Sequence, residues 1–111
     1  MNDHAGCERI YHLALASDWA QAQILGEYAV STRGRTLAEE GFIHASRAHQ
    51  WPGVRARFYA DVTEPLVLLE IDPALITAEV RDEHVPGTDE TFPHVYGPID
   101  LRAVVDTRAL S

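Results

Sequence analysis

Residues 66–72 read Leu-Val-Leu-Leu-Glu-Ile-Asp and are followed by Pro73. An extended run that is apolar on both faces is typical of a strand with a neighbour on each side. Pro73 offers no N–H for further pairing, so we expect the strand to end there. Glu70 should then face a cleft or pair with an arginine, because an unpaired buried charge is too costly. The sequence predicts a sheet centred on this strand, with four side chains nearly fully buried: Val67, Leu68, Leu69 and Ile71.

Shorter strands and helices are predicted on both sides of this central strand. Strand composition or alternation marks residues 10–15, 28–30, 42–46, 78–84 (an edge strand) and 101–110. Helical signals mark residues 19–25 after the cap pair Ser17–Asp18, 36–40 and 52–59, and a turn is expected over 31–34. Regular strand–helix–strand spacing is missing. The pattern therefore favours an α+β fold, a split and twisted mixed sheet with short helices, over a doubly wound sheet.

Length and composition indicate one small domain. The 111 residues, 46% of them hydrophobic, suffice for a single core, so residues 1–111 are predicted to form one domain, with residues 1–8 frayed. A single cysteine, Cys7, cannot form an internal disulfide. No apolar run approaches the ~18 residues of a membrane helix, and the first residues do not resemble a signal peptide. We expect a cytoplasmic protein with no membrane partner.

The charge balance excludes some functions. The formal net charge is -8, which speaks against general nucleic-acid binding, since that binding depends on neutralising phosphates. All nine basic residues are arginines. A mechanism through a lysine Schiff base is therefore excluded.

Residues 90–100 read Glu-Thr-Phe-Pro-His-Val-Tyr-Gly-Pro-Ile-Asp, and the two prolines restrict the backbone between them. In an extended segment His94 and Tyr96 share one face, while Val95 points toward a core. We therefore expect Val95 to carry the packing and His94 to be free of a core role. One interpretation is a preformed binding or catalytic surface. The other is a proline-braced loop whose polar side chains cap neighbouring backbone.

Two further histidines, His12 and His44, interrupt apolar strands. Each is either a satisfied core histidine or part of a cleft floor. A neutral imidazole donates from one nitrogen and accepts at the other, which suits a ribose hydroxyl or an amide. Together with His94 they could instead form a zinc site with three histidines, but no short His-x-His spacing supports it, and no metal is expected. Ser46 is better suited to polar binding than to nucleophilic attack.

Charged residues near these segments have two interpretations each. Glu90 could stabilise an oxocarbenium-like transition state next to a ribose, or it is a solvated loop acid. Arg33 and Arg35 could bind phosphate bidentately, or they are ordinary surface arginines.

The segments 41–46, 66–72 and 91–99, with Ile10-Tyr11-His12 and Trp19, resemble an uncharacterised bacterial family of similar length. It is catalogued as domain of unknown function nine-five-two. The resemblance covers nearly the whole chain, and the combined motifs are specific.

That family's fold resembles the ADP-ribosyltransferase superfamily, nearest the RNA 2′-phosphotransferases. Those enzymes carry the strand motifs Tyr-His-Gly-Thr and His-Val-His-Leu-Ser, to which Tyr11-His12 and residues 43–46 are similar. The resemblance implies contacts to NAD or ADP-ribose by His12, His44 and Ser46. This chain departs from the pattern at residues 13–14, where Leu-Ala replaces Gly-Thr, and it has no clear counterpart of the arginines that hold the RNA phosphate.

The leading hypothesis is a nucleotide-binding or NAD/ADP-ribose-binding protein, in its catalytic form a small transferase or hydrolase, whose partner is a small nucleotide-type ligand. The ligand-binding set is His12, His44, Ser46, Arg33 and Arg35, and the catalytic set is His94, Tyr96 and Glu90. One alternative is a non-catalytic ligand sensor or partner-binding module on an inherited fold. Another is a metal hydrolase that uses the histidines.

Overall fold

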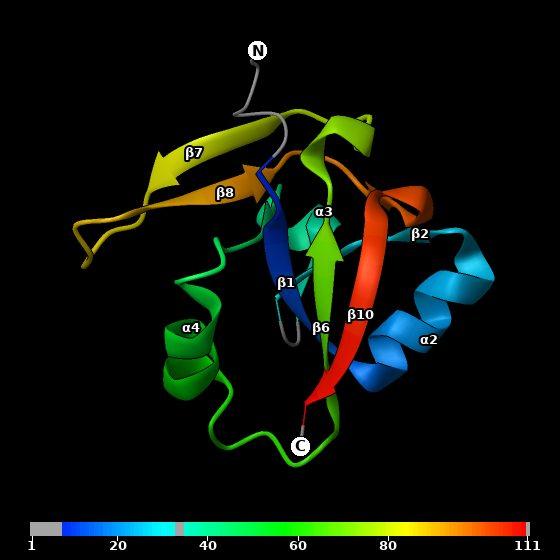
Figure 1. Cartoon of the computed structure of the whole chain (residues 1–111), viewed down its shortest axis with the longest axis horizontal. Coiled ribbons are helices and arrows are strands. Elements are labelled where there is room, and N and C mark those ends of the chain that lie inside the picture. Colours follow the sequence, from blue (N-terminus) through cyan, green and yellow to red (C-terminus); the bar gives the residue numbers. More distant parts are fainter. Residues whose placement is uncertain (1–7, 33–34, 111) are drawn as a thin grey trace.

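The strand predicted at the centre of the sheet is central in the computed structural model, which describes residues 8–32 and 35–110 (Figure 1). β6 (Leu66–Ile71) lies between β1 (Ile10–Leu15) and β10 (Val104–Leu110), antiparallel to both. Leu68, Leu69 and Ile71 are buried as predicted. Val67 is only partly buried, because its partners across the sheet are the small side chains of Ala14 and Ala109.

The acid in the central strand has a basic partner. A carboxylate oxygen of Glu70 lies 3.8 Å from Nε of Arg9, and both side chains reach solvent. Of the two alternatives predicted for Glu70, a cleft position or an arginine partner, the structure shows the arginine partner.

A second three-stranded sheet has the order β5 (Ile43–His44), β8 (Thr91–Val95) and β7 (Val80–His84), with β7 at the edge as predicted. Two ribbons complete the strands: β2 (Glu27–Tyr28) with β9 (Ile99–Asp100), and β3 (Val30–Thr32) with β4 (Arg35–Thr36). The prediction of an α+β fold with a split sheet is thus confirmed.

The prediction of a mixed sheet is wrong, since the strands pair antiparallel throughout residues 8–32 and 35–110. A parallel pair needs a crossover, usually a helix, between two strands of one sheet. Here each α-helix instead connects strands that belong to different sheets. Residues 28–30, expected as one strand, are divided between β2 and β3. β3 also extends into the expected turn at 31–34, of which Arg33 and Gly34 lie outside the described residues.

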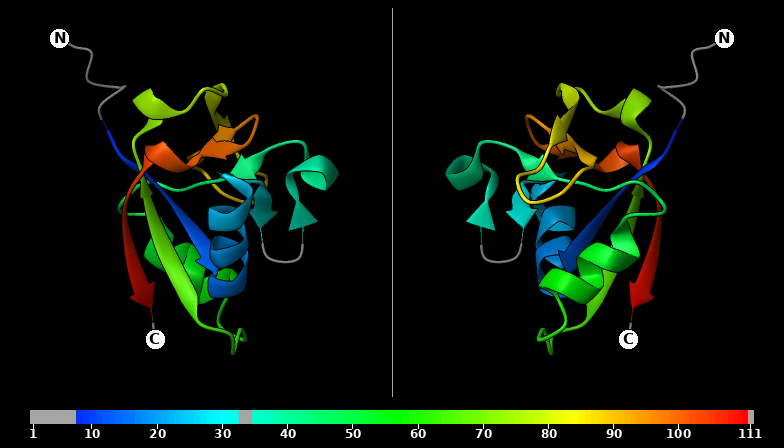
Figure 2. Two further views of the ribbon diagram at one scale, coloured as in Figure 1. Left: turned by 90° about the vertical axis from the view of Figure 1, so that its right-hand side faces the viewer. Right: turned by 90° about the vertical axis from the view of Figure 1, so that its left-hand side faces the viewer.

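Three α-helices flank the sheets: α2 (Ala16–Leu25), α3 (Leu37–Glu40) and α4 (Trp51–Phe58). Gly26 and Gly41 end the first two with φ of 93° and 88°, a backbone conformation that favours glycine. Figure 1 shows α4 beside β1 and α2 on the side of β10. Figure 2 shows α3 set apart from the β1–β6–β10 sheet. Two 3₁₀ turns, η1 (Pro73–Leu75) and η2 (Leu101–Ala103), precede β7 and β10.

Helix α2 begins earlier than the sequence predicted. Its N-cap is Leu15, so Ser17 and Asp18 lie in the first turn. The Ser17 amide and hydroxyl both donate to the carboxylate of Glu64, which satisfies a free N–H at the helix start. The acceptor comes from a segment 47 residues away, so the sequence around the helix could not reveal it.

The core joins both sheets. Leu69 and Ile71 from β6 belong to the same buried cluster as Ile43 from β5 and Val95 from β8. The backbones of Tyr11 and Ser46 also form a bridge between the two halves, with two N–H···O hydrogen bonds of 2.7 Å.

One close backbone approach requires a glycine. A Cβ at Gly97 would lie 2.6 Å from Cβ of Ala78, closer than carbon atoms pack. We expect Gly97→Ala to lower the free energy of unfolding by about 1–3 kcal/mol, as overpacked substitutions do. Urea denaturation measures the loss. The double variant with Ala78→Gly should lose less than the two single losses added together, and strict additivity would contradict the proposed clash.

Candidate functional site

Four rings meet on one face of the β5–β8–β7 sheet. They come from two neighbouring strand segments and are Phe42, His44, His94 and Tyr96. We call them the ring cluster. His44 and His94 are direct partners in the β5–β8 pairing, which places them on the same face. Phe42 stacks on His94 at 4.2 Å between centroids, and His44 meets His94 edge-on at 5.3 Å. Tyr96 lies 5.4 Å from Phe42. The structure thus brings together three of the predicted site residues.

The alternation predicted for residues 94–96 is present, with one correction. Val95 is fully buried in the core, and His94 and Tyr96 share the opposite face. The expectation that His94 has no packing role is wrong, because its residue is only 5% exposed. Phe42, from a distant part of the chain, stacks against its imidazole.

Glu83 on β7 is the acid of the ring cluster. Its Oε1 lies 2.7 Å from Nδ1 of His94 and also accepts a hydrogen bond from the Tyr96 hydroxyl. The hydrogen bond from Tyr96, followed by that from His94, lowers the pKa of Glu83. The same carboxylate raises the pKa of Tyr96. Both shifts favour an ionised Glu83 beside a neutral phenol.

The other ring nitrogen of His94 is the most unusual atom of the site. Because Nδ1 donates its proton to Glu83, Nε2 carries the lone pair in the neutral ring. Nε2 is buried, and within residues 8–32 and 35–110 it has no hydrogen-bond partner. Buried polar atoms are nearly always paired, so this acceptor is the strongest indication of a missing ligand group.

His44 forms the accessible side of the cluster. Its side chain is 41% exposed, and Nε2 lies 3.5 Å from Oε1 of Glu40. Burial lowers the pKa of His44, and the neighbouring Glu40 opposes that effect. Arg35 forms an ion pair of 2.7 Å with the same Glu40, so it lies at the edge of the cluster. Arg33, the other predicted phosphate ligand, lies outside the described residues.

His12 lies beneath the cluster rather than in it. Its Nδ1 donates to the carbonyl oxygen of His44 at 2.5 Å, and its Nε2 accepts from the hydroxyl of Tyr28 at 2.9 Å. Burial lowers the pKa of His12 to about 4, so the ring is neutral. Both nitrogens are occupied by the protein, so a ligand could contact them only by breaking one of these bonds. The arrangement fits a residue that holds β5 in place.

The structure does not bring the other two predicted residues into the ring cluster. Ser46 is buried, and its backbone pairs with Tyr11. Glu90 accepts a hydrogen bond from Gln50 at 2.9 Å, and 54% of its side chain is exposed. It precedes β8 by one residue, whereas Tyr96 follows the strand, and an extended segment separates such positions by ~3.3 Å per residue. The carboxylate near His94 is therefore Glu83, which the sequence analysis missed.

Glu83 could have been found only from the strand register. The alternation in residues 78–84 places Arg81 and Glu83 on one face, and the β7–β8 pairing then sets Arg81 opposite His94. The guanidinium of Arg81 lies 4.8 Å from the centre of the Tyr96 ring and is paired with Glu79.

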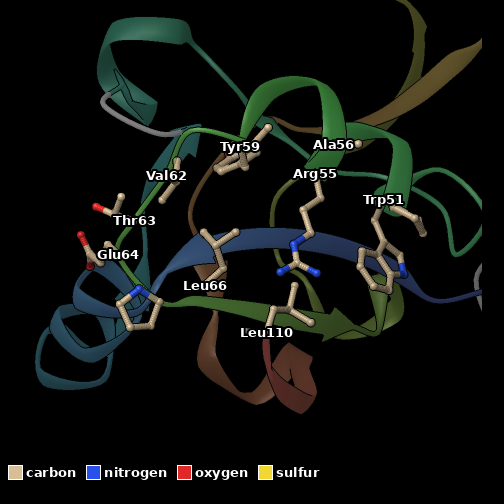
Figure 3. Close-up of a pocket in the computed structure, with 12 residues that line it drawn as sticks. Trp51, Arg55, Ala56, Tyr59, Val62, Thr63, Glu64, Leu66 and Leu110 are labelled. Atoms are coloured by element: carbon tan, nitrogen blue, oxygen red, sulfur yellow. The ribbon is translucent and has the colours of Figure 1, made fainter.

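His12, His44 and His94 line neither of two open cavities in the described chain. One, of about 630 Å³, includes Tyr96, Gly97 and Asp100 in its lining, and the other, of about 710 Å³, lies next to α4 (Figure 3). Across residues 8–32 and 35–110, no three His, Cys, Asp or Glu side chains are grouped so that they could hold a metal ion. None of the helices in the described part of the chain has the length and apolar character needed to cross a membrane.

Comparison with known proteins places the chain in a family without an assigned reaction. The family described as protein of unknown function (DUF952) matches residues 13–107, so the chain belongs to that family, as its motifs predicted. No curated protein matches the chain. The relation of the fold to the ADP-ribosyltransferase superfamily stays a prediction.

Solved structures of one bacterial protein share this fold. The crystal structure of protein CC0527 from Caulobacter crescentus is 25% identical, with a TM-score of 0.79 over 93% of this chain and 86% of that chain. The solution NMR structure of the same protein is 25% identical, with a TM-score of 0.72 over 90% and 82% of the two chains.

Proposed function

We propose that the ring cluster binds a small nucleotide-type ligand such as ADP-ribose or NAD, and that His94 accepts a proton or hydrogen bond from a ligand hydroxyl. The observation that carries this proposal is Nε2 of His94, a buried acceptor without a partner in the described chain. A ribose hydroxyl is a donor of suitable size and chemistry. A bound hydroxyl would donate the hydrogen bond that Nε2 of His94 lacks in the described chain.

Glu83 supports this role by fixing the imidazole. Its hydrogen bond to Nδ1 keeps the lone pair on Nε2, and its negative charge stabilises the imidazolium that forms when Nε2 takes a proton. Tyr96 donates to the same carboxylate and so limits its movement. With a ligand hydroxyl at Nε2, the order would be acid, histidine, hydroxyl, in which the acid orients the histidine that acts as general base. His94 is thus the proposed catalytic residue, and Glu83 is a positioning residue.

The rest of the cluster suits the remainder of such a ligand. His44 is half-exposed and offers a second imidazole beside His94. Arg35 supplies a positive charge at the edge of the cluster. Its guanidinium could bind a ligand phosphate through one side while it stays paired with Glu40 through the other.

A second candidate, recognition without turnover, is favoured by the depth of His94. Nε2 is buried in the free protein, so a ligand hydroxyl would reach it only after a neighbouring ring such as Phe42 or His44 moves, and the ligand held there would be shielded from hydrolysis. The same site would then act as a sensor. Binding measurements combined with product analysis separate the two functions.

The test is isothermal titration of the purified protein with ADP-ribose and with NAD, followed by mass spectrometry of the incubated ligand. We expect saturable binding, weakened by about tenfold or more in His94→Gln, which corresponds to the loss of one good hydrogen bond. Asp82→Asn is the matched control, since Asp82 precedes Glu83 on β7 but pairs with Arg47 and makes no contact with the ring cluster among its described ion pairs. Equal affinity of wild type and His94→Gln, with intact thermal melts, would contradict the proposal.

A further inference from the structure

Within residues 8–32 and 35–110, strand β7 has a neighbouring strand on one side only. It pairs with β8 along its whole length in a register without shifts, and it ends the order β5–β8–β7 (Figure 1). The N–H of Tyr96 donates to the carbonyl of Glu79, and the N–H of Val85 donates to the carbonyl of Glu90. Backbone groups of an antiparallel strand alternate between its two sides. The odd-numbered residues of β7 therefore bond to β8, and the even-numbered residues turn their N–H and C=O groups to the open side.

A proline in the neighbouring strand agrees with this alternation. Pro93 lies opposite Asp82 in the β7–β8 pairing and has no N–H to offer, and its carbonyl accepts from the N–H of Ala45 on the β5 side. The backbone of Asp82 therefore faces away from β8. On the open side β7 presents the N–H and C=O groups of Val80, Asp82 and His84, and a second strand laid antiparallel against this edge would pair with all of them.

The charges of β7 favour a second copy of this chain as that strand. In an antiparallel pairing centred on Asp82, Arg81 lies opposite the partner's Glu83, and the twofold axis repeats the same pair. Val80 then lies opposite the partner's His84. Centring the pairing on Arg81 or on Glu83 would instead set two like charges directly opposite each other, which destabilises a strand pair. The sequence Val-Arg-Asp-Glu-His therefore complements itself in one register.

The unfavourable contact of this register is the one between the two Asp82 side chains. Each carboxylate is already paired with the guanidinium of Arg47, so the repulsion between the two acids is weakened. Arg81 is also paired, because Glu79 binds its Nε and one terminal nitrogen at 2.9 and 3.0 Å. The side-chain charges therefore select the register, and the backbone hydrogen bonds supply the attraction.

We propose that two copies of the chain associate through β7, antiparallel about a twofold axis at Asp82. The β5–β8–β7 sheets of both copies would join into one continuous sheet. The partner's Arg81 would lie opposite Glu83, the carboxylate that binds His94, so the second copy would add a cation beside the ring cluster. The association rests on the strand edge and does not depend on the function proposed for the cluster. A single strand pair is a small interface, so the dimer should be weak and dependent on concentration.

The test is sedimentation velocity of the full chain at concentrations up to about 1 mM, where a small interface gives measurable association. We expect a reversible equilibrium between monomer and dimer. Asp82→Pro removes the N–H at the centre of the pairing and leaves the bonds to β8 intact, since proline is tolerated where an edge strand turns its N–H to solvent. It should weaken the dimer about tenfold or more, because both copies lose a hydrogen bond. Asp82→Asn is the matched control: it keeps the N–H and removes the facing charges, so it should strengthen the dimer.

Exchange of charges tests the register. Arg81→Glu and Glu83→Arg each set like charges opposite each other in their own dimers, so each variant alone should associate more weakly than wild type. Mixed in equal amounts, the two variants should form a heterodimer, because every opposing pair then carries opposite charges. Circular dichroism checks that each variant is folded. A wild type that stays monomeric at about 1 mM would overturn the proposal, as would an unchanged dimer in folded Asp82→Pro or the absence of a heterodimer between the two folded charge variants.

Discussion

Replacing Leu69 by alanine lowers the free energy of unfolding by about 2–5 kcal/mol, and we expect it to be among the most destabilising single truncations in the chain. Leu69 has no exposed surface and lies in the middle of β6, paired with His12 on one side and Thr107 on the other. Strands on both sides hold the backbone, so the structure cannot collapse into the space that the leucine leaves. Urea denaturation followed by circular dichroism measures the change.

Val67→Ala is the matched control for Leu69→Ala. It removes apolar atoms from the same strand at a position that is only partly buried, so its loss should be clearly smaller. If Leu69→Ala costs less than about 1 kcal/mol, the centre of β6 is not tightly packed, and the core assignment fails.

Acidification from pH 7 to pH 4 removes about 3 kcal/mol of stability through His12 alone. Burial lowers the pKa of this imidazole from 6.5 to about 4 in the folded chain, whereas the unfolded chain keeps the ordinary value. Below pH 6.5 His12 therefore binds a proton in the unfolded state but not in the folded state. The contribution of neutral His12 to the free energy of unfolding is fully present above pH 6.5. It falls as the pH drops below 6.5 and changes no further below about pH 4.

The measurement is the free energy of unfolding between pH 7 and pH 5, where about 2 kcal/mol of the His12 effect is already expressed. The lowered pKa values of Glu83, Glu64 and Asp100 lie below those of ordinary carboxyls, so these groups act mainly at lower pH. His12→Gln keeps a donor and an acceptor but cannot titrate, so it should flatten the profile. His44, whose pKa burial also lowers, contributes in the same direction. An equally steep profile in His12→Gln would show that another group is responsible.

Local sequence signals predicted most of the elements because their causes are local. The run at residues 66–71 is apolar on both faces and lies between two strands. Gly26 and Gly41 end helices, and Thr36 forms the capping box that opens α3. Each of these features depends on a few neighbouring residues, which the sequence displays directly.

The site was predictable only in part, because its decisive contacts join distant segments. Alternation placed His94 and Tyr96 on one face, and this is observed. The choice of Glu83 over Glu90 depends on the β7–β8 register, and the burial of His94 depends on Phe42, which is 52 positions earlier in the sequence. The two bonds that occupy His12 come from Tyr28 and from the His44 backbone. Strand register and tertiary packing of this kind cannot be predicted from any single segment of the sequence.

The outer edge of β10 has a consequence for how copies of the protein meet one another. An open edge strand of seven residues is a template on which a second chain can add and begin aggregation. In β10 the register shifts between Val104 and Asp106, which bends the strand, and the Asp106 carboxylate binds the Thr107 N–H. Asp106 and Arg108 further place charges of both signs along the exposed edge. The bend and the charges disfavour strand addition at this edge, which favours solubility at high concentration.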